Sequence, residues 1–164
     1  MIILLVGTTG VHHTLVAAHL YLQNTSAKEF TKLDGYCDLS LDSSGFPIHI
    51  GCDRLGNRVY TLGLGRLVGV GSSAINGFSQ IMGIDSSQLL IREIRIPGEL
   101  DIWAASKAGW VPLGIGNGIN RLVANFTITR EFNRIESEAI KLMEQVALLH
   151  GVSDNMTGFG YKAG

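Results

Sequence analysis

Apolar positions in the first part of the chain form a strand-like run followed by a helix-like stretch. Residues 2–6 (IILLV) are a continuous β-prone run, and an apolar, Ala-rich stretch extends from Val11 to Leu22. The Gly-Thr-Thr-Gly between them predicts a tight turn. The polar segment that follows, from Asn24 to Ser44, predicts a long loop with at most a short helix. Such loops often cover ligands, although a plain surface loop is more common.

Strand-like and helix-like segments continue to alternate along the rest of the chain. Two β-rich runs, 48–52 (IHIGC) and 58–62 (RVYTL), flank five residues with turn chemistry and predict an antiparallel hairpin. Helical spacing between 67 and 82 predicts a helix that ends at Gly83. The later segments predict a strand at 88–96, a helix at 99–110, a turn-rich segment at 111–120, a strand at 121–128 and an amphipathic helix from Arg130 to Gly151.

Strands that alternate with helices predict an α/β fold with three layers: a mainly parallel sheet with helices on both faces and one antiparallel hairpin. The 164 residues suffice for one such domain, residues 1–151, followed by a flexible tail at 152–164. Hydrophobic residues make up 46% of the chain and charged residues 16%, against about 25% charged in soluble domains, which excludes disorder. The 21 glycines indicate tight turns and close backbone approaches.

The charge and the cysteine content argue against several classes of function. A net charge of −1 gives no electrostatic basis for binding nucleic acid or an anionic membrane. The first apolar run is far shorter than the roughly 20 residues of a bilayer span and lacks the features of a secretory signal, so we expect a cytoplasmic protein. Cys37 and Cys52 favour reduced, structural thiols, and no three residues have the spacing of zinc ligands.

The segment that carries chemistry is Gly7-Thr8-Thr9-Gly10-Val11-His12-His13-Thr14, between the first strand and the first helix. Compared with the phosphate-loop pattern GxxxxGK[ST], its first Gly and last Thr match, while His12 and His13 replace the second Gly and the Lys. Amide groups and the helix dipole favour an anion there even without the Lys. The missing Lys argues against efficient hydrolysis of a nucleoside triphosphate.

Each candidate residue in and around this loop has a chemical and a structural interpretation. Protonated His12 and His13 would supply positive charge, and His12 is the candidate catalytic residue as a phosphate donor or general acid. Both could instead only cap or pack the helix. Thr14 would bind a phosphate oxygen, or Mg²⁺ brought by a nucleotide, unless it is only a first-turn hydroxyl. Arg66, before the next helix, would add a bidentate anion contact. Asp53 could mimic a metal-binding carboxylate, but the hairpin turn is the favoured interpretation.

Two motifs carry a family resemblance: Gly10-Val11-His12-His13-Thr14 before the Ala-rich helix, and the hairpin Gly51-Cys52-Asp53-Arg54-Leu55-Gly56-Asn57-Arg58-Val59-Tyr60-Thr61-Leu62-Gly63. With these motifs the chain resembles a small uncharacterised bacterial family, a domain of unknown function known mainly from spore-forming species. The resemblance extends from residue 1 to about 148. The chain differs from the family at Gly7, where members often carry Cys, and at His13, where a small hydroxyl residue is usual. It implies a phosphate-loop-like α/β fold and supplies no activity.

We therefore predict a cytoplasmic protein that binds a nucleotide or other phosphorylated small molecule at Gly7–Thr14, as a binder or as a slow phosphotransfer enzyme. The first alternative is an interaction or oligomerising domain in which Trp103, Trp110 and Phe159 contact a partner or a second copy of the chain. The second is histidine phosphotransfer through His12. The sequence identifies neither the ligand nor a reaction.

Overall fold

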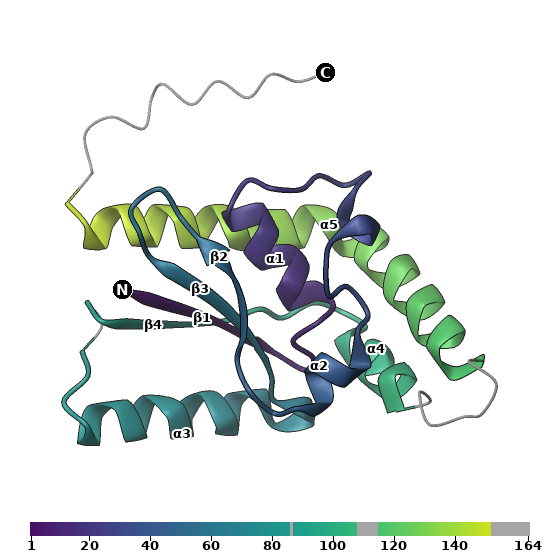
Figure 1. Ribbon diagram of the computed structural model, residues 1–164, viewed down its shortest axis with the longest axis horizontal. Helices are drawn as coiled ribbons and strands as arrows, with labels where there is room; N and C mark the ends of the chain where they lie inside the picture. The colour runs from purple at the N-terminus through teal and green to yellow at the C-terminus, as the bar shows by residue number, and fades with distance from the viewer. Residues whose placement is uncertain (86, 108–114, 152–164) are drawn as a thin grey trace.

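The computed structural model describes residues 1–85, 87–107 and 115–151, which form a four-stranded sheet between helices (Figure 1). The strands are β1 (Ile2–Gly7), β2 (Ile48–Cys52), β3 (Arg58–Gly63) and β4 (Leu89–Glu93). The helices are α1 (His13–Tyr21), α2 (Leu39–Ser43), α3 (Val68–Ile81), α4 (Glu99–Ser106) and α5 (Ile115–Leu149). Two 3₁₀ turns, η1 (Phe30–Lys32) and η2 (Gly65–Leu67), lie between them.

The sheet has the order β2-β3-β1-β4. Strand β1 pairs in parallel with β3 and β4, and β2 pairs with β3 in antiparallel orientation. This confirms the predicted α/β fold, the mainly parallel sheet and the hairpin. Because β1 is central and covered on both faces, it is a continuous apolar run, as parallel strands usually are.

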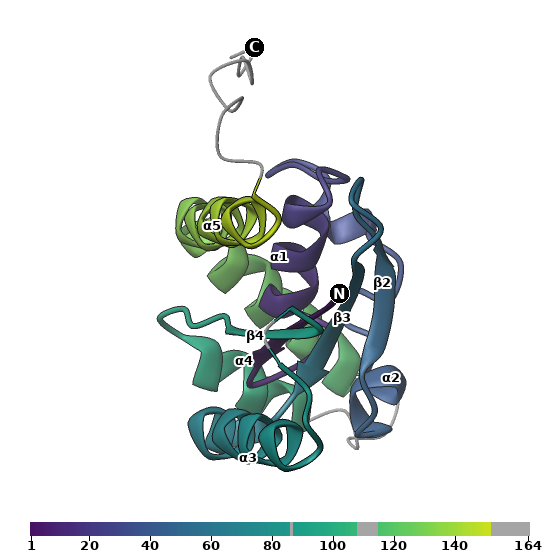
Figure 2. The ribbon, with the colours of Figure 1, turned by 90° about the vertical axis from the view of Figure 1, so that its left-hand side faces the viewer.

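The helices lie in two layers, one on each face of the sheet (Figure 2). On one face, Ile3 and Leu5 of β1 belong to a core formed with α1 and α5. On the other, Leu4 and Val6 pack in a smaller core with Val68 of α3. The alternation of side chains along β1 therefore divides its apolar residues between the two cores.

Helix α5 corrects two predictions. The segment 121–128 is helical and not a strand, and residues 115–120 of the predicted turn-rich segment are helical as well. One buried stripe explains the difference, since its members recur every three or four residues along the whole helix: Ala124, Ile128, Phe132, Ile135, Ala139, Leu142 and Val146. Burial of this stripe against α1 and the sheet overrides the β propensity of the local sequence.

The other elements agree with the sequence except at their ends. Helix α3 ends before Gly83, which has a φ of +71°. Strand β4 is shorter than the predicted 88–96, and α4 is described only as far as Ser106. The long polar segment contains only η1 and the short α2. Predictions for residues 108–114 and for the tail at 152–164 lie outside the described residues.

Candidate functional site

The candidate site is the loop between β1 and α1, at the carboxyl ends of the parallel strands. In open α/β sheets this is the edge at which ligands bind. All eight loop residues, Gly7–Thr14, are buried. The amide of Leu64 donates to the carbonyl oxygen of Gly7 at 2.8 Å, and the amide of Gly65 donates to that of Thr8 at 3.2 Å. The segment that leads from β3 to Arg66 therefore lies beside the loop.

Two glycines allow this close packing. A Cβ atom on Gly7 would lie 2.5 Å from Cγ2 of Thr14 and 2.7 Å from Nε2 of His13. A Cβ atom on Gly63, at the end of β3, would lie 2.9 Å from the amide nitrogen of Gly10. All three distances are shorter than any normal contact, so neither position has space for a side chain. The glycines of this edge are needed for close approach of backbone segments.

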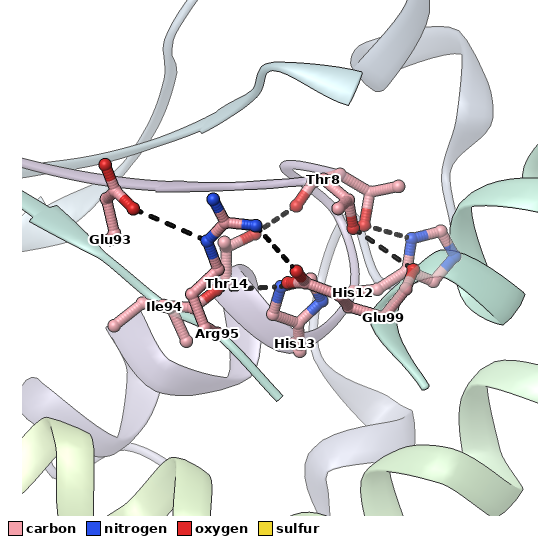
Figure 3. A network of polar contacts seen from close by, with 9 residues as sticks. Thr8, His12, His13, Thr14, Glu93, Ile94, Arg95 and Glu99 are labelled. Atoms are coloured by element: carbon pink, nitrogen blue, oxygen red, sulfur yellow. Dashed lines mark hydrogen bonds and ion pairs between the residues drawn. The ribbon is translucent and has the colours of Figure 1, made fainter. Parts of the chain in front are cut away.

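His12 and His13 are fully buried and have different partners (Figure 3). Nδ1 of His12 lies 2.9 Å from Oγ1 of Thr9, and Nε2 of His13 lies 3.2 Å from the carbonyl oxygen of Ile94. Burial lowers the pKa of His12 to about 3, with a further contribution from His13. Burial also lowers the pKa of His13 to about 4, although the Ile94 carbonyl partly opposes it. Both rings are therefore neutral at neutral pH, and the positive charge expected from their protonation is absent.

Glu99, in the first turn of α4, connects the loop to the end of β4 (Figure 3). Its carbonyl oxygen accepts from the Thr8 hydroxyl at 3.2 Å, and its Oε1 accepts from Nη1 of Arg95 at 2.9 Å. Its Oε2 lies 3.6 Å from Nε2 of His13. The network joins two segments that are far apart in the chain, the loop and residues 94–99.

The hydroxyl of Thr14 has a partner inside the loop. It donates to the carbonyl oxygen of Thr9, and this bond also links the start of α1 to the preceding turn. Thr14 therefore has no free hydroxyl proton for the phosphate oxygen that the sequence analysis assigned to it. Its observed role is the structural one.

A carboxylate already contacts the loop. The amide of Gly10 donates to Oδ1 of Asp42 at 2.6 Å. Asp42 comes from α2, a five-residue helix with no buried residue. Burial of its carboxyl group raises the pKa of Asp42, and the Gly10 amide and the charge of Lys107 only partly oppose this. One amide of the loop, that of Gly10, thus donates to the carboxyl group of a side chain that the sequence analysis did not identify.

Two cationic side chains lie near this edge. The guanidinium of Arg66 and the ammonium of Lys107 each lie 5.6 Å from the ring centroid of Trp103. A Cβ atom on Gly65, whose amide bonds to the loop, would lie 3.5 Å from Nε1 of Trp103. The segment that carries Arg66 therefore lies beside the loop, and Lys107 is a second cation at this edge that sequence reasoning missed.

A protein-family model matches most of the chain. The family described as "Protein of unknown function (DUF3189)" matches residues 2–104, from β1 to within α4. The chain belongs to this family. The predicted resemblance to an uncharacterised family is thereby confirmed, and the matched region contains the loop, Asp42 and the hairpin motif. No curated protein and no solved structure matches the chain.

Asp53 of this DUF3189 member lies at the opposite edge of the sheet from the loop, in the β2–β3 turn. Its carboxylate accepts from the amides of Leu55 and Asn57 at 2.9 and 2.8 Å and from the hydroxyl of Tyr21 at 2.5 Å. These contacts confirm the hairpin-turn interpretation and exclude a shared metal site with the loop. Asp53 also lines a groove of about 880 Å³ between the end of α1, the hairpin and α5.

Several buried polar atoms near the loop lack partners among the described residues. They are Nε2 of His12, Nδ1 of His13 and both amide atoms of Asn120, a residue of α5 that is fully buried. The Asn120 side chain lies near His12 and acts to raise its pKa. Buried polar groups without partners are uncommon in folded proteins and often mark functional positions.

Within the described ranges, no group of three or more His, Cys, Asp or Glu side chains is arranged to hold a metal ion. Among the helices described, none has both the length and the apolar character needed to cross a bilayer.

Proposed function

We propose that the protein binds a nucleotide or other phosphorylated small molecule at the β1–α1 loop, and that a phosphate oxygen replaces the carboxylate of Asp42 there. The observation that carries the proposal is the 2.6 Å hydrogen bond from the Gly10 amide to Asp42. A backbone amide at the start of a helix that holds a carboxylate is placed to hold a phosphate, because both are anionic oxygen acceptors.

The contact with Asp42 is weak enough to be exchanged. The raised pKa of Asp42 means that its surroundings stabilise the charged form less well than water does. Its helix, α2, has no buried residue, and its N-terminus is capped by Asp38, which accepts from the amides of Ser40 and Leu41. Movement of α2 away from the loop would therefore expose little apolar surface, and Asp42 would regain its hydration.

Positive charge for the ligand comes from the edge of the site and not from the loop itself. His12 and His13 are neutral, so the amide groups and the α1 dipole provide the contacts within the loop. Arg66 and Lys107 lie nearby on η2 and just after α4. This arrangement suits a ligand whose first phosphate contacts Gly10 and whose further anionic groups extend toward Arg66 and Lys107. Mg²⁺ would enter with a nucleotide.

Calorimetric titration with inorganic phosphate, AMP, ADP and ATP, each with and without Mg²⁺, tests the proposal. Asp42→Asn removes the competing charge and should raise the affinity about tenfold, since a hydrogen bond to a charged group contributes about 1.5 kcal/mol. Asp101→Asn, on the exposed side of α4, is the matched control and should bind like the wild type. If neither the wild type nor Asp42→Asn binds any of these compounds at concentrations far above millimolar, the proposal is wrong.

A second candidate function is phosphotransfer through His12. It rests on the neutral ring of His12, whose Nε2 has no partner among the described residues, since a neutral imidazole nitrogen is the nucleophilic form. Incubation with a small acyl phosphate should then produce acid-labile phosphate on the wild type and none on His12→Gln. Absence of the modification from the wild type would remove this candidate.

A further inference from the structure

Helix α3 carries large apolar side chains on the side that faces away from the sheet. Its inner side packs on the sheet through Val68 and Ile75 and buries the polar Ser72 and Ser79. Its outer side exposes a stripe that we name the α3 stripe, formed by Leu67, Val70, Ala74, Phe78 and Ile81. The four large side chains of the stripe are 64–83% exposed. A surface helix of a monomer usually has its apolar residues inside and its polar residues outside, so this distribution is unusual.

The described part of the chain leaves this side of α3 uncovered. Helices α1 and α5 lie on the opposite face of the sheet, and α3 forms the outer layer alone (Figures 1 and 2). The sequence of α3 from Val68 to Ile81 contains no charged residue. Two copies of the stripe can therefore meet without repulsion between like charges or burial of an unpaired charge.

The spacing of the α3 stripe is symmetric about Ala74. Its members follow one another at intervals of three, four, four and three residues. A second copy, antiparallel and related by a two-fold axis at Ala74, would pair Leu67 with Ile81 and Val70 with Phe78. Every large side chain then has an apolar partner, as a two-fold interface between identical surfaces requires. The small Ala74 at the centre lets the two helices approach closely.

The size of the surface also fits a dimer. Complete burial of the exposed stripe side chains would remove roughly 600 Å² per chain, so that two copies would bury at most about 1,200 Å², the lower end of the range for stable interfaces. We propose that the protein forms a two-fold symmetric homodimer in which the α3 stripes of two copies pack against each other. This interface is distinct from the β1–α1 loop and independent of the proposed ligand.

Sedimentation equilibrium of the full chain, from about 1 to about 100 µM, tests the dimer, because this range covers the micromolar affinities expected at the weak end of specific interfaces. The expected mass is twice the chain mass of 17.7 kDa. Ile81→Glu should shift the mass to the monomer, whereas Leu122→Glu, at an equally exposed apolar position on α5, should leave the dimer intact. Circular dichroism of both variants verifies that they fold.

A cross-linking measurement tests the symmetry axis. Its variants also carry Cys52→Ser, because Cys52 is a free and exposed thiol. Ala74→Cys lies at the axis and should form a disulfide-linked dimer on mild oxidation, whereas Asn76→Cys, on the same helix but outside the stripe, should not. A wild type that is monomeric at about 100 µM overturns the proposal. A dimer that withstands Ile81→Glu, or equal cross-linking of the two cysteine variants, overturns it as well, because either result places the contact elsewhere.

Discussion

The two buried histidines make the stability of the fold depend on pH in a window where most side chains do not titrate. In the unfolded chain, His12 and His13 take up protons near the ordinary histidine pKa of 6.5. In the folded protein, with pKa values of about 3 and about 4, they remain neutral far below that pH. The unfolded state therefore binds more protons between pH 6.5 and 4, so stability is full above this window and is lost as the pH falls through it.

The size of the effect follows from the shifts. At pH 5 the solution is 1.5 units below the pKa of the unfolded histidine, and at 1.36 kcal/mol per unit each ring contributes about 2 kcal/mol of lost stability, or about 4 kcal/mol together. His19, whose pKa burial also lowers, adds to the loss. Asp42 opposes it, since its pKa is raised. Against a typical stability of 5–15 kcal/mol, the change is large.

Urea unfolding at pH 7 and at pH 5, with the slope m compared between them, measures this change directly. His13→Gln should roughly halve the pH dependence, whatever it does to stability at pH 7. His49→Gln, on the exposed side of β2, should retain the full dependence. Equal free energies of unfolding at pH 7 and pH 5 in the wild type would refute the reasoning, because they would mean that the histidines are not held neutral by burial.

One substitution in the site, with a matched control, tests its packing, and another in the hairpin turn tests the separation of the two regions. Gly63→Ala should destabilise the fold by about 1–3 kcal/mol, because its Cβ would lie 2.5 Å from Oδ1 of Asp42 and 2.9 Å from the amide nitrogen of Gly10. Gly118→Ala, in open space on α5, should stabilise the fold by about 0.5–1 kcal/mol in the same urea assay. A Gly63→Ala variant as stable as the wild type would contradict the close approach. Asp53→Ala should cost about 2 kcal/mol through its lost hydrogen bonds and should leave phosphate affinity unchanged. A change in that affinity would argue against the separation of the two regions.

The parts of the fold that the sequence predicted are those with a local signal. The run at 2–6 is apolar without interruption because β1 is covered on both faces, and Gly83 ends α3 because its φ is positive. The start of α5 has a misleading local signal, with glycines at 116 and 118 and a β-prone run after them. Only contact with α1 and the sheet makes that segment helical, and such contact is not visible in a window of ten residues.

The candidate site also has a part that the local sequence predicts and a part that depends on tertiary contacts. Its backbone, a turn between a strand and a helix, was predictable from spacing alone. Its chemistry was not, since Asp42 and Asn120 reach the loop from segments 30 to more than 100 residues away in the sequence. The neutral state of His12 and His13 depends on burial by those same segments. Sequence motifs locate such a loop, but the side chains that set its charge come from the tertiary structure.

The proposed exchange of anions at Gly10 would have a consequence for specificity. In the proposed exchange, one anionic oxygen leaves the Gly10 amide as another takes its place, so the hydrogen bond from this amide is kept. The affinity then depends on the difference between the hydration that Asp42 regains and the hydration that the ligand loses. Since burial disfavours the charged form of Asp42, its release to water supports binding. A compact phosphate group that fits close to the Gly10 amide gains from this exchange, whereas a bulky anion would meet Gly63 and the β3 backbone before it reached the amide.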